Sequence, residues 1–371
     1  MNKLGHMLVV GATGLVGYAA ARHFSATGWQ VTAVSRRRPE DLAGAAFAAV
    51  DLADATQCAA AFSAMPDVTH VVFAAYAEQP GTQGWRDPAQ MEFNLAMLRN
   101  VMEPLLAAAT GLQHVTLLQG TKAYGAPLSV IPIPARERAP RAPHAAFYWL
   151  QEDWLRERQR QQQRAQPWHW TILRPQIIFG ESLGSHMNII PAIGAYAALL
   201  RQAGEPLYFP GGVSWVREAV DASLLARACE WAATSAACRN ETFNITNGDV
   251  FEWRNAWPAI ADALGMQPGP DRPLALGRAM PARQDEWAAL VRGHCLTAPQ
   301  SLEAFVGQGF LYADRQFCHG MTEAPPARLV STIKARQAGF ADCIDTEDMF
   351  RRCFARFQER GWLPARNAAR L

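Results

Sequence analysis

The first half of the chain alternates between short apolar runs and longer stretches of helical period. Each apolar run has the length of a buried strand, and each amphipathic stretch repeats its apolar positions every three or four residues. The apolar runs cover residues 7–11, 30–34, 68–74, 113–118 and 170–173, and the helical stretches cover 14–28, 54–64, 88–109 and 145–164. Strands that alternate with helices predict an α/β fold, in which helices cover both faces of a doubly wound parallel sheet.

The second half is mainly of helical period. Helices are predicted at 184–204, 216–233, 284–293, 299–308 and 346–361, a sixth strand at 241–246 and a loop at 268–273. Because the sixth strand returns the chain to the sheet, we predict a discontinuous nucleotide-binding domain and a smaller, mainly helical substrate-binding region. The first comprises residues 1–183 and 212–250, and the second comprises residues 184–211 and 251–371.

Composition narrows the class of protein. Half of the 371 residues are hydrophobic and 18% are charged, which is typical of a globular chain. A net charge of +2 argues against a nucleic-acid or membrane-surface partner. The seven cysteines contain no CxxC pair, so we expect no metal site, no disulfide framework and a cytoplasmic location. No apolar segment reaches the roughly 20 residues of a membrane span, and a homodimer is compatible with the sequence without being required by it.

Three glycines follow the first predicted strand at a spacing of three. The segment Gly11-Ala12-Thr13-Gly14-Leu15-Val16-Gly17 leads directly into a helix. Glycines at such a turn let the backbone approach a pyrophosphate, and the helix N-terminus favours its negative charge. We predict a dinucleotide site, with a tight turn that binds nothing as the alternative. Its predicted residues are Gly11, Thr13, Gly14, Leu15, Val16 and Gly17.

The end of the second strand indicates which dinucleotide binds. An enzyme that prefers NAD usually has an acidic residue there, whereas this chain has Ser35, Arg36 and Arg37. Guanidinium groups suit a 2′-phosphate, so the sequence favours NADPH over NADH, with a solvated basic loop as the alternative. Asp51 and Leu52 are candidates for contacts with the adenine, although Asp51 is almost as well explained by a simple turn.

The catalytic candidates depart from the usual short-chain dehydrogenase pair, a Tyr with a Lys four residues later. The best-placed tyrosine is Tyr148, and four residues later stands Glu152. Only three lysines occur among the 35 basic residues, and one of them, Lys122, follows the fourth strand. A tyrosine hydroxyl can donate to a substrate oxygen as negative charge develops, and a nearby ammonium lowers the phenol pKa. Tyr148 and Lys122 are therefore the predicted catalytic residues, and Tyr124 is the competing hydroxyl.

Two further residues are predicted to contact the cofactor. Gln119 stands at the carboxyl end of the fourth strand, where doubly wound folds bind their ligands. Ile177 follows the fifth strand in a segment whose backbone is placed to hold a nicotinamide carboxamide.

These motifs resemble the progesterone 5β-reductase/iridoid synthase-like enone reductases, which are atypical extended short-chain dehydrogenases. The resemblance runs nearly end to end. It rests on the glycine turn, Ser35-Arg36-Arg37, Gln119-Gly120-Thr121-Lys122, Phe147-Tyr148, Glu152-Asp153, Arg174-Pro175, Asn247-Gly248-Asp249 and Gly361-Trp362-Leu363-Pro364. The resemblance implies that hydride passes from NADPH to the β-carbon of an enone or enal. It also implies that Tyr148, with Lys122 nearby, stabilises the resulting enolate.

The chain departs from the plant members of that family at two places. Trp149 stands where they often have a second Tyr, and the segment after the third strand reads Phe73-Ala74-Ala75-Tyr76. The first change means that only Tyr148 can serve as the catalytic tyrosine here. The second alters the expected pocket wall and argues against a bulky steroid substrate. The predicted pocket residues are Tyr76, Trp149, Met187, Phe305 and Phe310.

Two other functions stay open. A nucleotide-sugar epimerase or dehydratase shares the fold, but that chemistry uses the Lys that is missing at position 152. A non-catalytic NADPH sensor is the second alternative, although such proteins commonly lack both the Tyr and the Lys.

Overall fold

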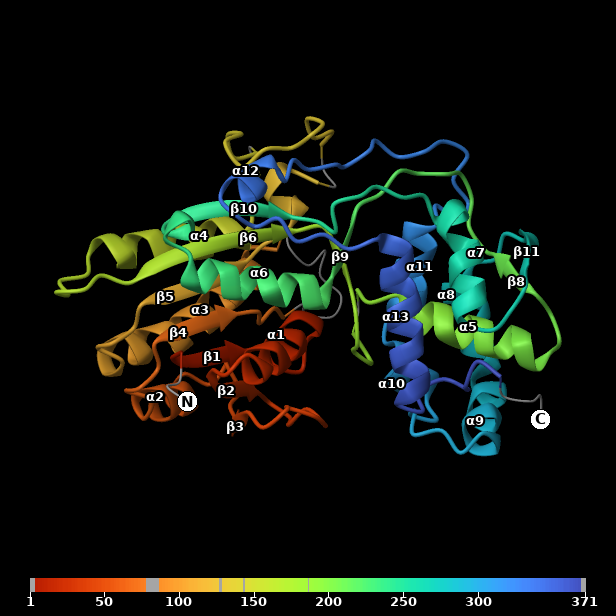
Figure 1. Ribbon diagram of the computed structural model, residues 1–371, viewed down its shortest axis with the longest axis horizontal. Helices are drawn as coiled ribbons and strands as arrows, with labels where there is room; N and C mark the ends of the chain where they lie inside the picture. Colours follow the sequence, from red (N-terminus) through yellow and green to blue (C-terminus); the bar gives the residue numbers. More distant parts are fainter. Residues whose placement is uncertain (1–3, 78–86, 127–128, 143, 186, 368–371) are drawn as a thin grey trace. The chain divides into compact units, whose positions relative to one another are not determined.

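The computed structural model describes residues 4–77, 87–126, 129–142, 144–185 and 187–367 (Figure 1). The chain forms two compact units. The first comprises Met1–Gln176, Ala222–Ile245 and Arg328–Ala341, and the second comprises Ile177–Asp221, Thr246–Ala327 and Asp342–Leu371.

The first unit is built on a seven-stranded sheet. Its strand order is β10-β6-β5-β4-β1-β2-β3, and every neighbouring pair is parallel. This arrangement confirms the predicted doubly wound sheet, because the chain starts near the middle and winds outward in both directions. The strands are β1 (His6–Val10), β2 (Gln30–Ser35), β3 (Ala46–Ala49), β4 (His70–Phe73), β5 (His114–Leu118), β6 (His169–Pro175) and β10 (Glu241–Ile245).

Helices cover both faces of this sheet. Helices α1 and α6 pack against each other on one face, while α3 packs between α2 and α4 on the other (Figure 1). On the α3 side, Leu8, Val71 and Val115 of adjacent strands share one core with Phe62 and Leu98, and all five are fully buried. The helices of this unit are α1 (Leu15–Ala26), α2 (Ala55–Ser63), α3 (Pro88–Ala108), α4 (Phe147–Arg160), α6 (Ala222–Thr234) and α12 (Ile333–Gln337).

Two features of the first unit differ from the sequence prediction. The edge strand β3 was not predicted, because its four residues are three alanines and one phenylalanine and its sides are half-exposed. The segment 328–341 belongs with the sheet rather than with the second region. It is held there by a bridge between Val330 and Ala135 and by an ion pair of 2.6 Å between Lys334 and Glu241.

The second unit is mainly helical, with two pairs of short strands. Helix α5 is buried almost all round, which fits its high content of Ala, Ile and Leu. The predicted loop at 268–273 is wrong in part, because Pro268–Asp271 forms strand β11 beside β8. The elements are β7 (Ile177–Phe179), α5 (Ile190–Gln202), β8 (Leu207–Phe209), β9 (Ala219–Asp221), α7 (Trp253–Ala263), β11, α8 (Leu276–Ala279), α9 (Gln284–Gly293), α10 (Leu302–Val306), α11 (Gly309–Gln316) and α13 (Thr346–Glu359).

A buried amide explains the Asn247-Gly248-Asp249 segment in structural terms. The side chain of Asn247 accepts from the Asp221 N–H at 2.7 Å and donates to the Thr346 hydroxyl at 3.1 Å. The Asp249 carboxylate accepts from both the backbone N–H and the hydroxyl of Thr346, at 2.9 and 2.6 Å. The segment therefore ties β9 to the start of α13.

Two negative findings hold for the described residues. None of the helices found there is both long enough and apolar enough to cross a membrane. In the same part of the chain, no group of three or more His, Cys, Asp and Glu side chains could hold a metal ion.

Candidate active site

The glycine turn joins β1 to α1 through very close backbone contacts. The N–H groups of Gly11 and Ala12 both donate to the Val34 carbonyl at 2.9 Å. Gly11 has a φ of +92°, and a Cβ on Gly17 would lie 2.2 Å from the Gly11 carbonyl oxygen. Both positions therefore require glycine.

The start of α1 presents backbone N–H groups without a side-chain acceptor. Gly14 is its N-cap and has no side chain, and the first turn contains no acidic residue. Thr13 and Gly14 are exposed, and Leu15 and Val16 are half-buried. Since the N-terminus of a helix carries partial positive charge, this turn is suited to an anionic group.

Two arginines at the end of β2 have side chains free to bind a ligand. The Arg36 and Arg37 guanidinium groups are exposed and contact no acidic or aromatic side chain among the described residues, whereas Arg38 lies over the Phe47 ring at 5.9 Å. The Ser35 hydroxyl donates to the Arg37 carbonyl at 2.7 Å, which fixes the turn that presents them.

The Asp51 side chain takes part in a turn, which is the predicted alternative to a contact with the adenine. Its carboxylate accepts from the Ala53 N–H at 3.1 Å. Leu52 is buried, and its carbonyl accepts from the Asn100 side chain at 2.8 Å.

The Tyr148 hydroxyl lies at the carboxyl end of β5. A Cβ built on Gly120 would be 3.3 Å from the Tyr148 oxygen, so the hydroxyl sits directly against the backbone at this position. Burial raises the pKa of Tyr148, and the positive charge of Arg174 acts in the opposite direction. The phenol therefore stays protonated at neutral pH and can act as a hydrogen-bond donor.

Lys122 lies over the first ring of a row of aromatic rings whose last member is Tyr148. It belongs to a short 3₁₀ turn, Thr121–Tyr124, directly after β5. Its ammonium is 5.9 Å from the centre of the Tyr76 ring, which stacks on Phe147 at 5.3 Å. Phe147 in turn contacts Tyr148 edge to face at 4.4 Å. The turn after β5, the segment after β4 and the first turn of α4 therefore contribute successive members of this row, in which Tyr76 and Phe147 stand between Lys122 and Tyr148.

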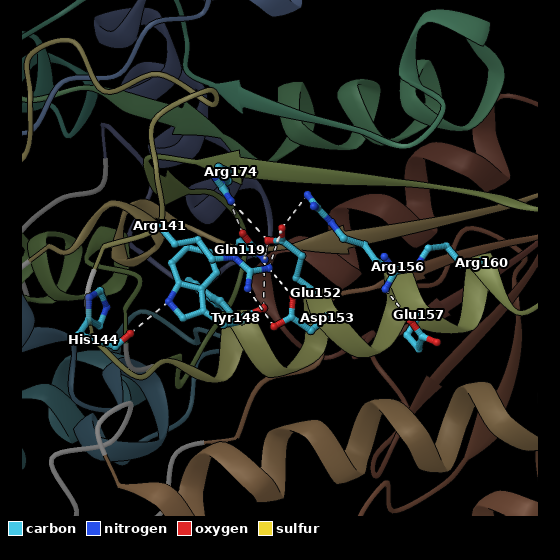
Figure 2. A network of polar contacts seen from close by, with 11 residues as sticks. Gln119, Arg141, His144, Tyr148, Glu152, Asp153, Arg156, Glu157, Arg160 and Arg174 are labelled. Atoms are coloured by element: carbon cyan, nitrogen blue, oxygen red, sulfur yellow. Dashed lines mark hydrogen bonds and ion pairs between the residues drawn. The ribbon is translucent and has the colours of Figure 1, made fainter.

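The position four residues after Tyr148 holds a buried carboxylate surrounded by positive charge (Figure 2). Glu152 is 2% exposed. One of its oxygens accepts from Arg156 at 2.7 Å and Arg141 at 3.1 Å, and the other faces Arg174 at 3.4 Å. A lysine at this position would face three guanidinium groups, so the arginines of this chain suit a carboxylate and disfavour the usual lysine.

The competing hydroxyl, Tyr124, is committed to a structural contact. It donates to the Asn244 side-chain oxygen at 2.6 Å, and the same amide donates to the Ala135 and Ser331 carbonyls at 3.2 and 3.1 Å. Burial raises the pKa of Tyr124, and the Arg174 guanidinium 5.1 Å from its ring lowers it.

Two other predicted residues of the first unit take part in the same polar network. The Gln119 side chain bonds to Arg174 and Glu152, which gives it a structural role. Trp149 is buried, donates to the His144 carbonyl at 3.2 Å and lies against Arg141 at 4.7 Å.

Four predicted residues lie in the second unit. Phe305 is fully buried against Trp287, with 4.7 Å between ring centres, and Phe310 is buried in the same core. This packing accounts for both residues without a ligand. Met187 is 47% exposed, and Ile177 pairs with Ala219 where β7 meets β9.

Sequence reasoning missed the side chains that hold the segment after β4. Asn94 of α3 is fully buried, and its amide accepts from the Ala77 N–H at 3.1 Å and donates to the Ala77 carbonyl at 2.9 Å. Gln90 also donates to that carbonyl. Two amides on the apolar face of a predicted helix were the signal that could have indicated such a role, because buried amides need partners.

Comparison with known proteins assigns the chain to a family. Residues 7–246 match the NAD dependent epimerase/dehydratase family. A 3-oxo-Delta(4,5)-steroid 5-beta-reductase of Arabidopsis thaliana is 32% identical over 304 residues, which cover 77% of this chain and 76% of that protein. An (S)-8-oxocitronellyl enol synthase of Camptotheca acuminata is 32% identical over 306 residues, with the same coverage of 77% and 76%. This chain is a progesterone 5β-reductase/iridoid synthase-like member of the epimerase/dehydratase family.

Solved structures of two UDP-glucose 4-epimerases share the fold. The UDP-glucose 4-epimerase of Thermotoga maritima, solved with UDP-glucose, has a TM-score of 0.64 at 16% identity and covers 95% of this chain and 99% of its own. The Thermus thermophilus UDP-glucose 4-epimerase, solved with NAD, has a TM-score of 0.63 at 20% identity, with the same coverage of 95% and 99%.

The residues of this family member fit a nicotinamide dinucleotide. Gly11 and Gly17 allow the tight backbone packing that forms the turn, and the first turn of α1 offers N–H donors to a pyrophosphate. The chain is therefore an oxidoreductase-type protein of an NAD(P)-dependent family.

Proposed function

We propose that this protein reduces the C=C bond of α,β-unsaturated carbonyl compounds with NADPH. The names of its relatives support this reaction. One is a reductase of a 3-oxo-Δ4,5 steroid, which is a conjugated ketone, and the other is a synthase of an enol.

The observation that carries the proposal is the Tyr148 hydroxyl against Gly120, with Glu152 in place of the usual Lys. In the standard pair, the lysine assists proton transfer between the tyrosine and an alcohol or ketone oxygen. A protonated phenol without that lysine is better suited to donate a hydrogen bond than to remove a proton. Stabilisation of an enolate oxygen needs only such a donor.

In the proposed reaction, bound NADPH supplies the hydride that adds to the β-carbon of the substrate. The π electrons of the C=C bond move toward the carbonyl, and negative charge develops on its oxygen. Tyr148 donates its hydrogen bond to that oxygen, and one such donor contributes roughly 3 kcal/mol to the transition state. Lys122 adds positive charge near the same site. The α-carbon then takes a proton from water, which gives the saturated carbonyl compound.

NADPH is proposed over NADH because of Arg36 and Arg37. Their exposed guanidinium groups have no acidic partner among the described residues, and the end of β2 has no carboxylate to bind a free ribose 2′-hydroxyl. A 2′-phosphate would supply a negatively charged partner for these two guanidinium groups.

The experiment that tests the function identifies the product. The protein is incubated with NADPH and a panel of small cyclic enones, open-chain enals and progesterone, and the products are separated by mass. The proposal predicts a saturated ketone or aldehyde from at least one small member of the panel. Allylic alcohols as the only products, or NADPH binding without any turnover, would contradict it.

The structural likeness to UDP-glucose 4-epimerases supports the fold and no second function. Epimerase chemistry on this fold uses the lysine four residues after the tyrosine, and Glu152 occupies that place with three arginines around it.

A further inference from the structure

We propose that Glu152 is a positioning residue for the reaction proposed above. Through Gln119 and Arg174, it fixes the first turn of α4 and thereby holds the Tyr148 hydroxyl against Gly120. The inference rests on the proposed function, and it concerns how this chain replaces the role of the missing lysine.

One amide group joins the two ends of the first turn of α4 to the sheet (Figure 2). The Gln119 side-chain nitrogen donates to the Tyr148 carbonyl at 3.3 Å and to the Glu152 carboxylate at 3.1 Å. Gln119 follows the last residue of β5, and its N–H donates to the Leu173 carbonyl of β6 at 2.9 Å. The amide is therefore anchored to the central strands of the sheet.

Arg174 determines which way this amide points. Its Nε donates to the Gln119 side-chain oxygen at 2.9 Å, which leaves the amide nitrogen to face α4. Arg174 is itself buried. Its guanidinium lies 5.1 Å from the centre of the Tyr124 ring and 5.8 Å from the centre of the Trp149 ring. A buried guanidinium needs a counterion, and Glu152 is the carboxylate that supplies it.

The Tyr148 hydroxyl faces the side of Gly120 from which a side chain would project. A Cβ on Gly120 would lie 3.3 Å from the Tyr148 oxygen, so the hydroxyl reaches the backbone at the end of β5 only because this residue has no side chain. A movement of the first turn of α4 away from the strand would take the hydroxyl away from this position. A misplacement of about 1 Å in a catalytic group can lower the rate roughly a hundredfold.

The test uses two substitutions in the network and one control. Glu152→Gln keeps the shape and removes the charge, and Gln119→Met removes the amide while the ion pairs stay. Glu157→Gln is the control, because Glu157 is on the same helix and pairs with Arg160 at the surface. We expect kcat to fall by about 10- to 100-fold in both network variants. The Kd for NADPH and the KM for the enone should change less than about twofold, and the control should match the parent.

A double-mutant cycle separates positioning from general damage to the fold. In a Tyr148→Phe background the hydroxyl is absent, so Glu152→Gln should cause no further loss of kcat. A loss of the same factor in both backgrounds would overturn the inference, because Glu152 would then act independently of that hydroxyl.

A second readout needs no substrate. The protein is labelled with 3-fluorotyrosine, and the Tyr148 resonance is assigned by its absence in Tyr148→Phe. Glu152→Gln and Gln119→Met should shift or broaden this resonance, and Glu157→Gln should leave it unchanged. If the parent reduces no enone, the proposed function fails and this spectrum still decides the positioning. An unmoved resonance in both network variants would overturn the inference.

Discussion

Acidification should destabilise the first unit through two buried histidines that stand in a row of three. His70, His114 and His169 are the first residues of β4, β5 and β6, and the strand register places them side by side. His70 and His114 are each 4% exposed. Burial lowers the pKa of His70 to about 4 and, together with the charges of its histidine neighbours, lowers the pKa of His114 to about 3.

The sign and size of the effect follow from these values. Both folded pKa values lie below the usual 6.5, so the unfolded chain binds protons first as the pH falls. The stability that the two neutral histidines provide is complete above pH 6.5 and is lost as the pH falls toward the folded pKa values. At pH 5 each histidine should cost about 2 kcal/mol of unfolding free energy. A combined loss of about 4 kcal/mol is a large part of the 5–15 kcal/mol that is typical of a folded protein.

The assay is urea unfolding followed by far-UV circular dichroism at pH 8 and pH 5. His114→Leu should reduce the difference in unfolding free energy between the two pH values by about 2 kcal/mol, because Leu cannot titrate. Thr116→Val is the matched control, since Thr116 is fully buried on the same strand and has no charge to change. The reasoning is refuted if His114→Leu loses as much stability as the parent between pH 8 and pH 5.

Three further predictions concern the site. Tyr148→Phe should lower kcat for enone reduction about 100-fold, measured as NADPH oxidation at 340 nm, and Tyr124→Phe should lower the unfolding free energy by about 1 kcal/mol with a smaller effect on kcat. Equal effects on kcat would contradict the assignment. Arg36→Ala with Arg37→Ala should raise the KM for NADPH at least tenfold and leave that for NADH nearly unchanged; a parallel rise for both would show that the arginines do not read the 2′-phosphate. Gly17→Ala should abolish NADPH binding in calorimetry, because its Cβ would lie 2.2 Å from the Gly11 carbonyl oxygen; unchanged affinity would contradict the turn geometry.

Much of the sheet could be predicted from the sequence because its strands are short apolar runs between clear helical patterns. The prediction of β1 differs from the structure by one residue at each end. Strand β3 was missed because alanines at a half-exposed edge have little strand signal. The return of 328–341 to the sheet was missed because it depends on distant partners, such as Glu241 for Lys334.

Parts of the site could be predicted where the residue type and its local spacing were enough to indicate a role. The glycine turn needed no partner to be recognised, and Glu152 was visible as an anomaly four residues after Tyr148. Two of its three arginine partners were not visible, because Arg141 and Arg174 come from a loop and from β6 and meet Glu152 only after folding. For the same reason the sequence could not assign Tyr124 to its structural bond with Asn244, which is 120 positions away.

The most direct test of the proposed reaction follows the hydride itself. The protein is supplied with NADPH that carries deuterium at both C4 positions and with a small cyclic enone, and the product is examined by ²H NMR and mass spectrometry. The account predicts one deuterium at the β-carbon of a saturated ketone, with the α-hydrogen taken from water. Deuterium on the carbonyl carbon of an allylic alcohol would contradict it, because hydride would then have attacked the carbonyl and not the conjugated double bond.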